Sequence, residues 1–190
     1  MYLIIDTETT GLTRLAFANP ENCTSWPRMV QVAWAPAHDN GEHVEYMSHI
    51  IRPVGFEIPP TAVRIHGITS QYAQEHGKPI KEILKELNRS MAKAHTLIGH
   101  NLNFDIGVIQ SEVYRLNATI ELPTQRVCTL HAGIRFLKER KGRKNPGRPT
   151  LSLLYENLFG FDFYPKHDAG ADVKACSHSF FRLQKLNFID

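Results

Sequence analysis

The chain has 190 residues, of which 42% are hydrophobic and 22% are charged. This balance is typical of one soluble globular domain, and it argues against intrinsic disorder and against a fold that needs disulfides or metal ions as staples. An excess of 22 Lys and Arg over 19 Asp and Glu permits a polyanionic partner without requiring one. The sequence has no signal peptide pattern and no apolar run long enough to span a membrane. The widely spaced Cys23, Cys128 and Cys176 favour a reducing compartment, the cytoplasm, over a disulfide framework or a zinc site.

The first third of the chain predicts an antiparallel meander of three strands. Residues 2–5 form a short apolar run that ends at acids, which is typical of a buried central strand. Residues 29–35 alternate apolar and smaller side chains and predict the second strand. The Asn-Gly pair at 40–41 signals a hairpin, so residues 43–52 should return as the third strand.

The rest of the chain predicts helices that alternate with short strands. Apolar residues recur at helical spacing over residues 79–93, which predicts an amphipathic helix. Similar patterns predict a strand over 96–99, a helix over 104–116 capped by Asn103, a strand over 126–128, and helices over 150–158 and 169–186. Strands followed by alternating helices and strands indicate a mixed α/β sheet with helices on its faces.

Two segments lack a periodic pattern. Residues 13–28 are predicted to form a long loop, and long loops inside compact domains are often functional. Residues 138–148 carry six of the 22 basic residues, opposed by Glu139 alone, and are predicted to form a flexible loop. Charge alone leaves two possibilities open for this basic loop, a solvated surface turn or a contact with nucleic acid.

Four acids lie where the elements of such a sheet would meet. Asp6 and Glu8 are two residues apart on a strand, so both side chains should project from the same face. Asp105 and Asp172 lie in the first turns of two predicted helices, where the backbone dipole alone would explain an acid. Because strand ends and helix starts meet in one crevice of an α/β sheet, the four acids together suggest a site.

His167 precedes the last predicted helix. Asp168 should cap that helix and Ala169 should allow close packing, so that Asp172 faces inward one turn later. With 10 histidines in the chain, a single histidine is weak evidence for function. Its neighbours matter more, because they would place a titrating base beside an acid suited to bind a metal ion.

Three motifs follow one another along the chain: D-T-E-T-T-G-L at residues 6–12, G-H-N-L-N-F-D at 99–105 and H-x-A-x-x-D at 167–172. In this order they resemble the motifs of the DEDDh-type, DnaQ-like 3′–5′ exonucleases, the family of the proofreading epsilon subunit of bacterial DNA polymerase III. Two shorter segments, V-Q-V-A at 30–33 and I-H-G-I-T at 65–69, extend the likeness from Met1 to about Leu183.

The resemblance implies an α/β, ribonuclease H-like fold in a single domain over residues 1–190. Its five-strand mixed sheet would have the antiparallel meander first, then parallel strands, with helices on both faces. The resemblance also implies that two Mg²⁺ or Mn²⁺ ions are held by four acids and that His167 is the general base. The four acids are Asp6, which would bridge the ions, Glu8, Asp105 and Asp172. Hard divalent ions prefer oxygen ligands, and imidazole suits proton transfer near neutral pH, so the chemistry agrees.

The implied reaction is hydrolysis of the terminal phosphodiester of DNA at single-stranded or frayed 3′ ends, with release of nucleoside 5′-monophosphates. By the same resemblance, seven residues are expected to contact the terminal nucleotide: Thr9, Thr10, Gly11, Leu12, His66, Asn101 and Phe104. For Leu12 and Phe104, ordinary core packing is an equal alternative.

The basic loop and the long 13–28 segment depart from the family pattern. We expect four residues of the basic loop to contact backbone phosphates: Arg140, Lys141, Arg143 and Lys144. The partner would be a DNA 3′ end, with a DNA polymerase or repair complex as a further partner and no membrane. The sequence shows no added tail after the last predicted helix, which favours a free-standing enzyme.

Two alternatives stay open at this point. An exoribonuclease that trims RNA 3′ ends would use the same chemistry, although the T-T-G-L and I-H-G-I-T segments favour DNA. A nucleic-acid-binding module without catalysis would need no crowded acids, so the retention of all four acids and His167 argues against it.

Overall fold

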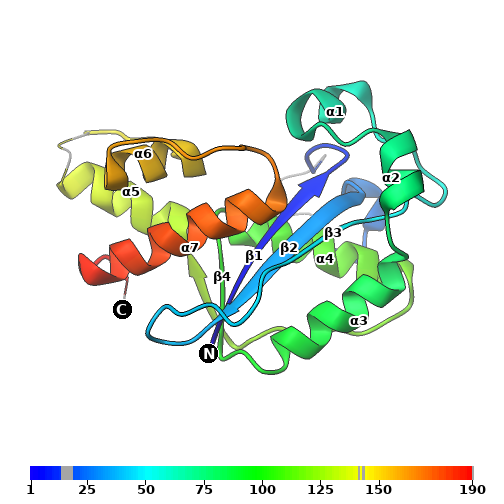
Figure 1. Ribbon diagram of the computed structural model, residues 1–190, viewed down its shortest axis with the longest axis horizontal. Helices are drawn as coiled ribbons and strands as arrows, with labels where there is room; N and C mark the ends of the chain where they lie inside the picture. The colour runs from blue at the N-terminus through cyan, green and yellow to red at the C-terminus, as the bar shows by residue number, and fades with distance from the viewer. Residues whose placement is uncertain (14–18, 141, 143, 190) are drawn as a thin grey trace.

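The computed structural model describes residues 1–13, 19–140, 142 and 144–189 (Figure 1). Its strands form one sheet in the order β3-β2-β1-β4-β5. They are β1 (Tyr2–Thr9), β2 (Met29–Ala37), β3 (Met47–Ile50), β4 (Thr96–Gly99) and β5 (Gln125–Cys128). β1, β2 and β3 pair antiparallel, and β4 and β5 extend the sheet parallel to β1. The predicted five-strand mixed sheet is confirmed.

Helices cover both faces of this sheet (Figure 1). α3 (Ile80–Met91) and α4 (Leu102–Arg115) lie on one face, and α5 (Thr129–Glu139), α6 (Leu151–Phe159) and α7 (Ala169–Lys185) lie on the other. Two short helices, α1 (Pro60–His66) and α2 (Ser70–His76), and the 3-10 turn η1 (Cys23–Ser25) lie in the connections. Among the described residues, no helix combines the length and apolar character that crossing a membrane requires.

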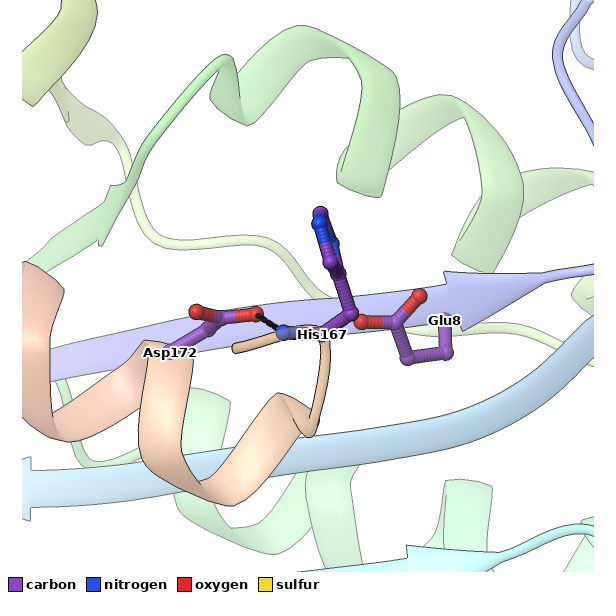
Figure 2. A group of neighbouring side chains, drawn as sticks. All are labelled: Glu8, His167 and Asp172. Atoms are coloured by element: carbon purple, nitrogen blue, oxygen red, sulfur yellow. Dashed lines mark hydrogen bonds between the residues drawn. The ribbon is translucent and has the colours of Figure 1, made fainter. Parts of the chain in front are cut away.

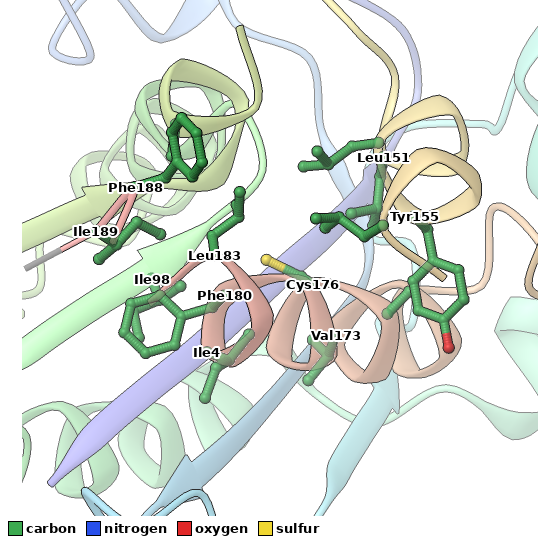
Figure 3. Packing of buried hydrophobic residues seen from close by; sticks show 14 of the residues in the cluster. Ile4, Ile98, Leu151, Tyr155, Val173, Cys176, Phe180, Leu183, Phe188 and Ile189 are labelled. Carbon is green, nitrogen blue, oxygen red and sulfur yellow. The ribbon is translucent and has the colours of Figure 1, made fainter. Parts of the chain in front are cut away.

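β1 lies in the middle of the sheet and contributes to both cores. Leu3 and Ile5 belong to the cluster with α3 and α4, whereas Ile4 belongs to the cluster with α5, α6 and α7. Figure 3 shows Ile4 beside Val173 and Phe180 of α7. Burial of one such side chain contributes about 1.5–3 kcal/mol, so β1 and α7 are fixed firmly against each other. This packing decides where the polar residues that follow Ile5 are placed.

Several predicted boundaries were wrong. β1 continues through the acids to Thr9, because its pairing with β2 continues as far as Met29. Only Met47–Ile50 of the predicted third strand pairs as a strand, with His43 in an isolated bridge to Ala37. Pro36 explains this interruption, since proline has no N–H to donate to the neighbouring strand.

One further expectation about a helix failed, and three helices were not predicted. Asn103 does not cap α4, because the helix begins at Leu102 and its N-cap is Asn101, in the left-handed conformation that asparagine tolerates. α1 and α2 were not predicted, since each spans seven residues and buries a single alanine, which leaves no apolar period to detect. α5 was also missed, although its Leu130 and Leu137 are seven residues apart and its Ala132 and Phe136 are four apart, which is helical spacing.

Candidate active site

The end of β1 directs its acids to one face and a threonine to the other. Asp6 and Glu8 alternate with Thr7, so they project to the α7 side while Thr7 projects towards α4. Thr7 donates from its backbone N and its Oγ1 to Asp105 Oδ1, at 3.1 and 2.7 Å. Because β1 and β4 are parallel, α4 begins at the edge where β1 ends. Asp105 is thereby held next to the acids of β1.

The start of α7 is held over the same edge of the sheet. Asp168 caps the helix by accepting a hydrogen bond from Ala171 N at 3.0 Å, as predicted. The side chain of Gln31 on β2 binds this turn through two hydrogen bonds of 3.1 Å. Its Nε2 donates to Asp168 Oδ2, and its Oε1 accepts from Ala169 N. Sequence reasoning missed this role of Gln31, although a polar residue inside an apolar strand was a signal for it.

His167 and Asp172 meet Glu8 at the start of α7. Asp172 Oδ2 accepts a hydrogen bond from His167 N at 3.1 Å (Figure 2). Glu8, His167 and Asp172 each offer a ligand atom, and these three atoms all lie within 4.8 Å of one another. The side chain of His167 is exposed to solvent, whereas that of Asp172 is buried. The backbone of His167 has a positive φ of 57°. Two carboxylates and an imidazole at this spacing can hold a divalent cation.

The carboxylates are crowded enough to disturb one another. Burial raises the pKa of Glu8 to about 8, and the charges of Asp172 and Asp105 contribute. Burial also raises the pKa of Asp105 and of Asp172, although hydrogen bonds to both carboxylates act in the opposite direction. The pKa of Asp6 lies well above its usual range because of burial first and the neighbouring acids second. A divalent cation would offset this repulsion, so the four acids fit the metal ions that the family resemblance implies.

The metal-free protein should therefore lose stability as the pH rises above about 6.5. The folded-state pKa values of Glu8 and Asp172 exceed their unfolded values, so the stability that these groups contribute is lost as the pH rises towards about 8. Histidines whose pKa is lowered by burial, such as His100, make the protein more stable as the pH rises, but this effect ends at about pH 6.5, the pKa of an unfolded histidine.

Urea unfolding in EDTA should show the free energy of unfolding fall by at least about 2 kcal/mol between about pH 6.5 and pH 8. The Glu8→Gln variant should show a smaller fall. Adding Mn²⁺ in excess of the chelator should restore the free energy of unfolding of the wild-type protein at about pH 8. A metal-free wild-type protein that is equally stable at both pH values would contradict the crowding of the acids.

Comparison with known proteins agrees with this geometry. The family model described as "Exonuclease", RNase_T, matches residues 3–180. The chain belongs to the RNase_T exonuclease family. It is 28% identical over 149 residues to the DNA polymerase III subunit epsilon of Buchnera aphidicola, and 26% identical over 158 residues to that of Pasteurella multocida.

These alignments cover 75% and 82% of the chain but 56% of each epsilon subunit, so the chain spans little more than half of these relatives. The fold resembles E. coli exonuclease I, solved in complex with a dA16 oligonucleotide, with a TM-score of 0.75 at 22% identity. That match covers 97% of this chain and 40% of exonuclease I. The predicted ribonuclease H-like fold of the DnaQ-like exonucleases is confirmed.

The family's T-T-G-L segment forms the turn after β1. Thr9 Oγ1 donates to Gly11 O at 2.6 Å, and Thr10 Oγ1 accepts from Arg28 N at 2.9 Å. Gly11 has a positive φ of 155°, which disfavours any other residue there. The side chain of Leu12 is 83% exposed, so the core-packing alternative is wrong for Leu12. This exposed leucine, four residues after Glu8, offers an apolar surface to a substrate.

The other three predicted nucleotide contacts lie at the start of α4 or near His167. His66 is half-buried; burial lowers the pKa of its imidazole, and the neighbouring His167 lowers it further. Asn101 precedes α4 and accepts a hydrogen bond from Arg148 Nη2 at 2.7 Å. Phe104 is half-buried against the core and lies 6.2 Å from the ring of Trp26, so it is part core and part wall.

One end of the basic loop is anchored beside the site. His100 Nε2 lies 2.9 Å from Pro149 O, next to the contact between Arg148 and Asn101. Lys144 is exposed, whereas Arg140 lies at the far end of α5, with its guanidinium 6.0 Å from the centre of the Phe188 ring. Lys141 and Arg143 lie outside the described residues, as do residues 14–18 of the long predicted loop.

A pocket of about 330 Å³ opens between the acids and α6. Asp6 and Asp172 form one side of it, and Lys166 and Phe163 contribute a cation and an apolar ring. Lys166 pairs with Asp162, which also accepts a hydrogen bond from Ser152 Oγ. Sequence reasoning did not identify Lys166, although it directly precedes His167.

Proposed function

We propose that this chain hydrolyses the terminal phosphodiester of DNA at single-stranded or frayed 3′ ends and releases nucleoside 5′-monophosphates. The observation that carries the proposal is the convergence of four acids and a histidine from β1, α4 and the start of α7. Relatives named DNA polymerase III subunit epsilon support DNA as the substrate and a polymerase or repair complex as a partner.

Asp6, Glu8, Asp105 and Asp172 would hold two Mg²⁺ or Mn²⁺ ions. When bound, such ions supply Lewis acidity that activates water and offsets the charge developing on the leaving 3′ oxygen. Thr7 holds the carboxylate of Asp105 through two hydrogen bonds, and the backbone N–H of His167 holds that of Asp172. These contacts orient the oxygen atoms in advance.

His167 is the general base in this proposal. Its imidazole is exposed at the mouth of the site and lies next to the carboxylates of Glu8 and Asp172. Neutral imidazole accepts a proton from water near neutral pH, and the exposed position lets it pass the proton on to solvent.

The apolar side chains beside the acids would bind the terminal base. Leu12 is exposed and Phe104 is half-buried next to Trp26, so an unpaired base can lie against an apolar surface here. Bases stack on such surfaces with little regard to sequence, which suits a frayed 3′ end better than a paired one.

Neutralising the basic loop should weaken binding of single-stranded DNA and flatten its salt dependence. The quadruple variant Arg140→Ala, Lys141→Ala, Arg143→Ala and Lys144→Ala should reduce the slope of log K against log salt by about 0.7 for each phosphate that the loop no longer neutralises. Binding is measured in EDTA by fluorescence anisotropy of a labelled oligonucleotide. Arg140→Ala alone should change little, because Arg140 follows the end of α5 and its guanidinium lies over the Phe188 ring, so the effect should come mainly from the other three residues. A quadruple variant with the wild-type slope would show that the loop is a solvated turn.

End-labelled oligonucleotides test the proposed reaction directly. With Mg²⁺, a 5′-labelled single strand should shorten stepwise, and a 3′-labelled strand should release its label first as a mononucleotide. EDTA should stop both reactions. DNA should be degraded faster than RNA of the same sequence; faster degradation of RNA would favour the RNA-trimming alternative, and binding without cleavage would favour the non-catalytic one.

A further inference from the structure

A second polar pocket lies at the far end of α7 from the acids. Its volume is about 630 Å³, and it is bounded by the connection between β2 and β3, the end of α6 and the last turns of α7. Figure 1 shows this half of α7 between α6 and that connection. Asp172 and Arg182 are ten residues apart on the helix, a separation of about 15 Å at 1.5 Å per residue. The pocket is therefore separate from the candidate active site.

Side chains that carry or accept positive charge line this pocket. His178, Arg182 and Lys185 follow one another at helical spacing on one face of α7, and His43 faces them from the β2–β3 connection. Within the described ranges, neither Arg182 nor Lys185 forms an ion pair, and no acid lines the pocket. Two unpaired cations at this spacing favour an anion with several oxygen atoms.

His43 adds a polar group that the described protein leaves unsatisfied. Its Nε2 lies 2.9 Å from Ser177 Oγ, whereas its buried Nδ1 has no hydrogen-bond partner in the part of the chain that the structure describes. Buried polar atoms without a partner are rare and unfavourable. The nearest acid in sequence, Glu42, accepts a hydrogen bond from Asn40 Nδ2 at 3.0 Å.

Apolar and aromatic side chains also line the pocket. Phe159 and Phe181 line it together with Leu158, and Gly41 lies against the Phe181 ring. A Cβ added at Gly41 would stand 3.6 Å from that ring. Aromatic rings and cations lining one pocket match a ligand with a flat apolar part and an anionic part.

We propose that this pocket binds a nucleotide, with its phosphate at Arg182 and Lys185 and its base against Phe159 and Phe181. The volume lies within the range of about 300–1,000 Å³ that small-ligand pockets occupy. The same chemistry is offered by a free nucleoside monophosphate and by a nucleotide unit within a strand. The proposal does not depend on the exonuclease reaction, because it concerns a separate surface.

Calorimetric titration with dAMP in EDTA tests the proposal, since chelation prevents hydrolysis and metal-mediated binding at the acids. The wild-type protein should bind dAMP, and the variant Arg182→Ala/Lys185→Ala should bind it at least about 10-fold more weakly. The matched variant Lys85→Ala/Arg89→Ala removes one lysine and one arginine from the exposed side of α3 and should bind as the wild type does. Both changes are at exposed positions, so the fold should persist.

Three further ligands separate the possible sources. Adenosine and inorganic phosphate should each bind more weakly than dAMP, because each lacks half of the recognised group. If d(A)4 binds more tightly than dAMP, and Arg182→Ala/Lys185→Ala removes this difference, the ligand is a nucleotide unit within a strand. If d(A)4 binds more weakly than dAMP, the ligand is the free nucleotide. The proposal is overturned if dAMP does not bind, if the α7 variant binds it normally, or if phosphate alone binds as tightly.

Discussion

Asp6→Asn should lower the rate of 3′-terminal hydrolysis by about 10³-fold or more while leaving the fold intact. Asp6 lies among the other three acids and would help to hold the ions. The substitution should also stabilise the metal-free protein, because the pKa of Asp6 is raised by burial and by its neighbours' charges. A gain of about 1–3 kcal/mol, or several degrees in Tm, is expected. Single-turnover kinetics and thermal unfolding in EDTA measure the two effects.

Asp39→Asn is the matched control for Asp6→Asn. Asp39 is exposed, and hydrogen bonding from His95 lowers its pKa. The control should keep full activity and should not stabilise the protein, since its charge is favourable in the folded state. An Asp6→Asn variant with near wild-type activity, or one that is less stable without metal, would contradict the assignment of Asp6.

His167→Ala should lower kcat by about 10²–10⁴-fold, the usual contribution of a general base. KM for the oligonucleotide should change little, because His167 is exposed and the proposal gives it a proton to accept rather than substrate to hold. Added imidazole should restore part of the rate. His76→Ala, at an exposed position on α2, should be as active as the wild type.

His167 lies close enough to Glu8 and Asp172 to be a metal ligand itself, and the His167→Ala variant also tests this alternative. A general base that is not a metal ligand leaves the Mn²⁺ concentration for half-maximal activity unchanged when it is removed. A large rise in that concentration, with no rescue by imidazole, would instead make His167 a metal ligand and contradict its role as the base.

Local signals in the sequence were sufficient for much of the site. Alternation along β1 placed Asp6 and Glu8 on one face, and the D-A-G-A segment correctly predicted Asp168 as the cap of α7. Both features depend on residues within four positions of each other, which is the range over which periodicity and capping act. The order of the three motifs then predicted the fold.

The contacts that hold the site together were beyond local patterns. Gln31 and Asp168 are 137 residues apart, and Thr7 and Asp105 are 98 residues apart. Such pairs arise only when the sheet brings β1, β2 and two helix starts to one edge. The anchoring of Arg148 by Asn101 is of the same kind, since charge alone could not place the basic loop.

The arrangement of the four carboxylates around divalent cations can be observed directly. Crystals soaked in MnCl₂ and measured for anomalous scattering should show two peaks, about 4 Å apart, among Asp6, Glu8, Asp105 and Asp172. Manganese absent from these side chains, or carboxylates that point away from one another in the soaked crystal, would contradict the account.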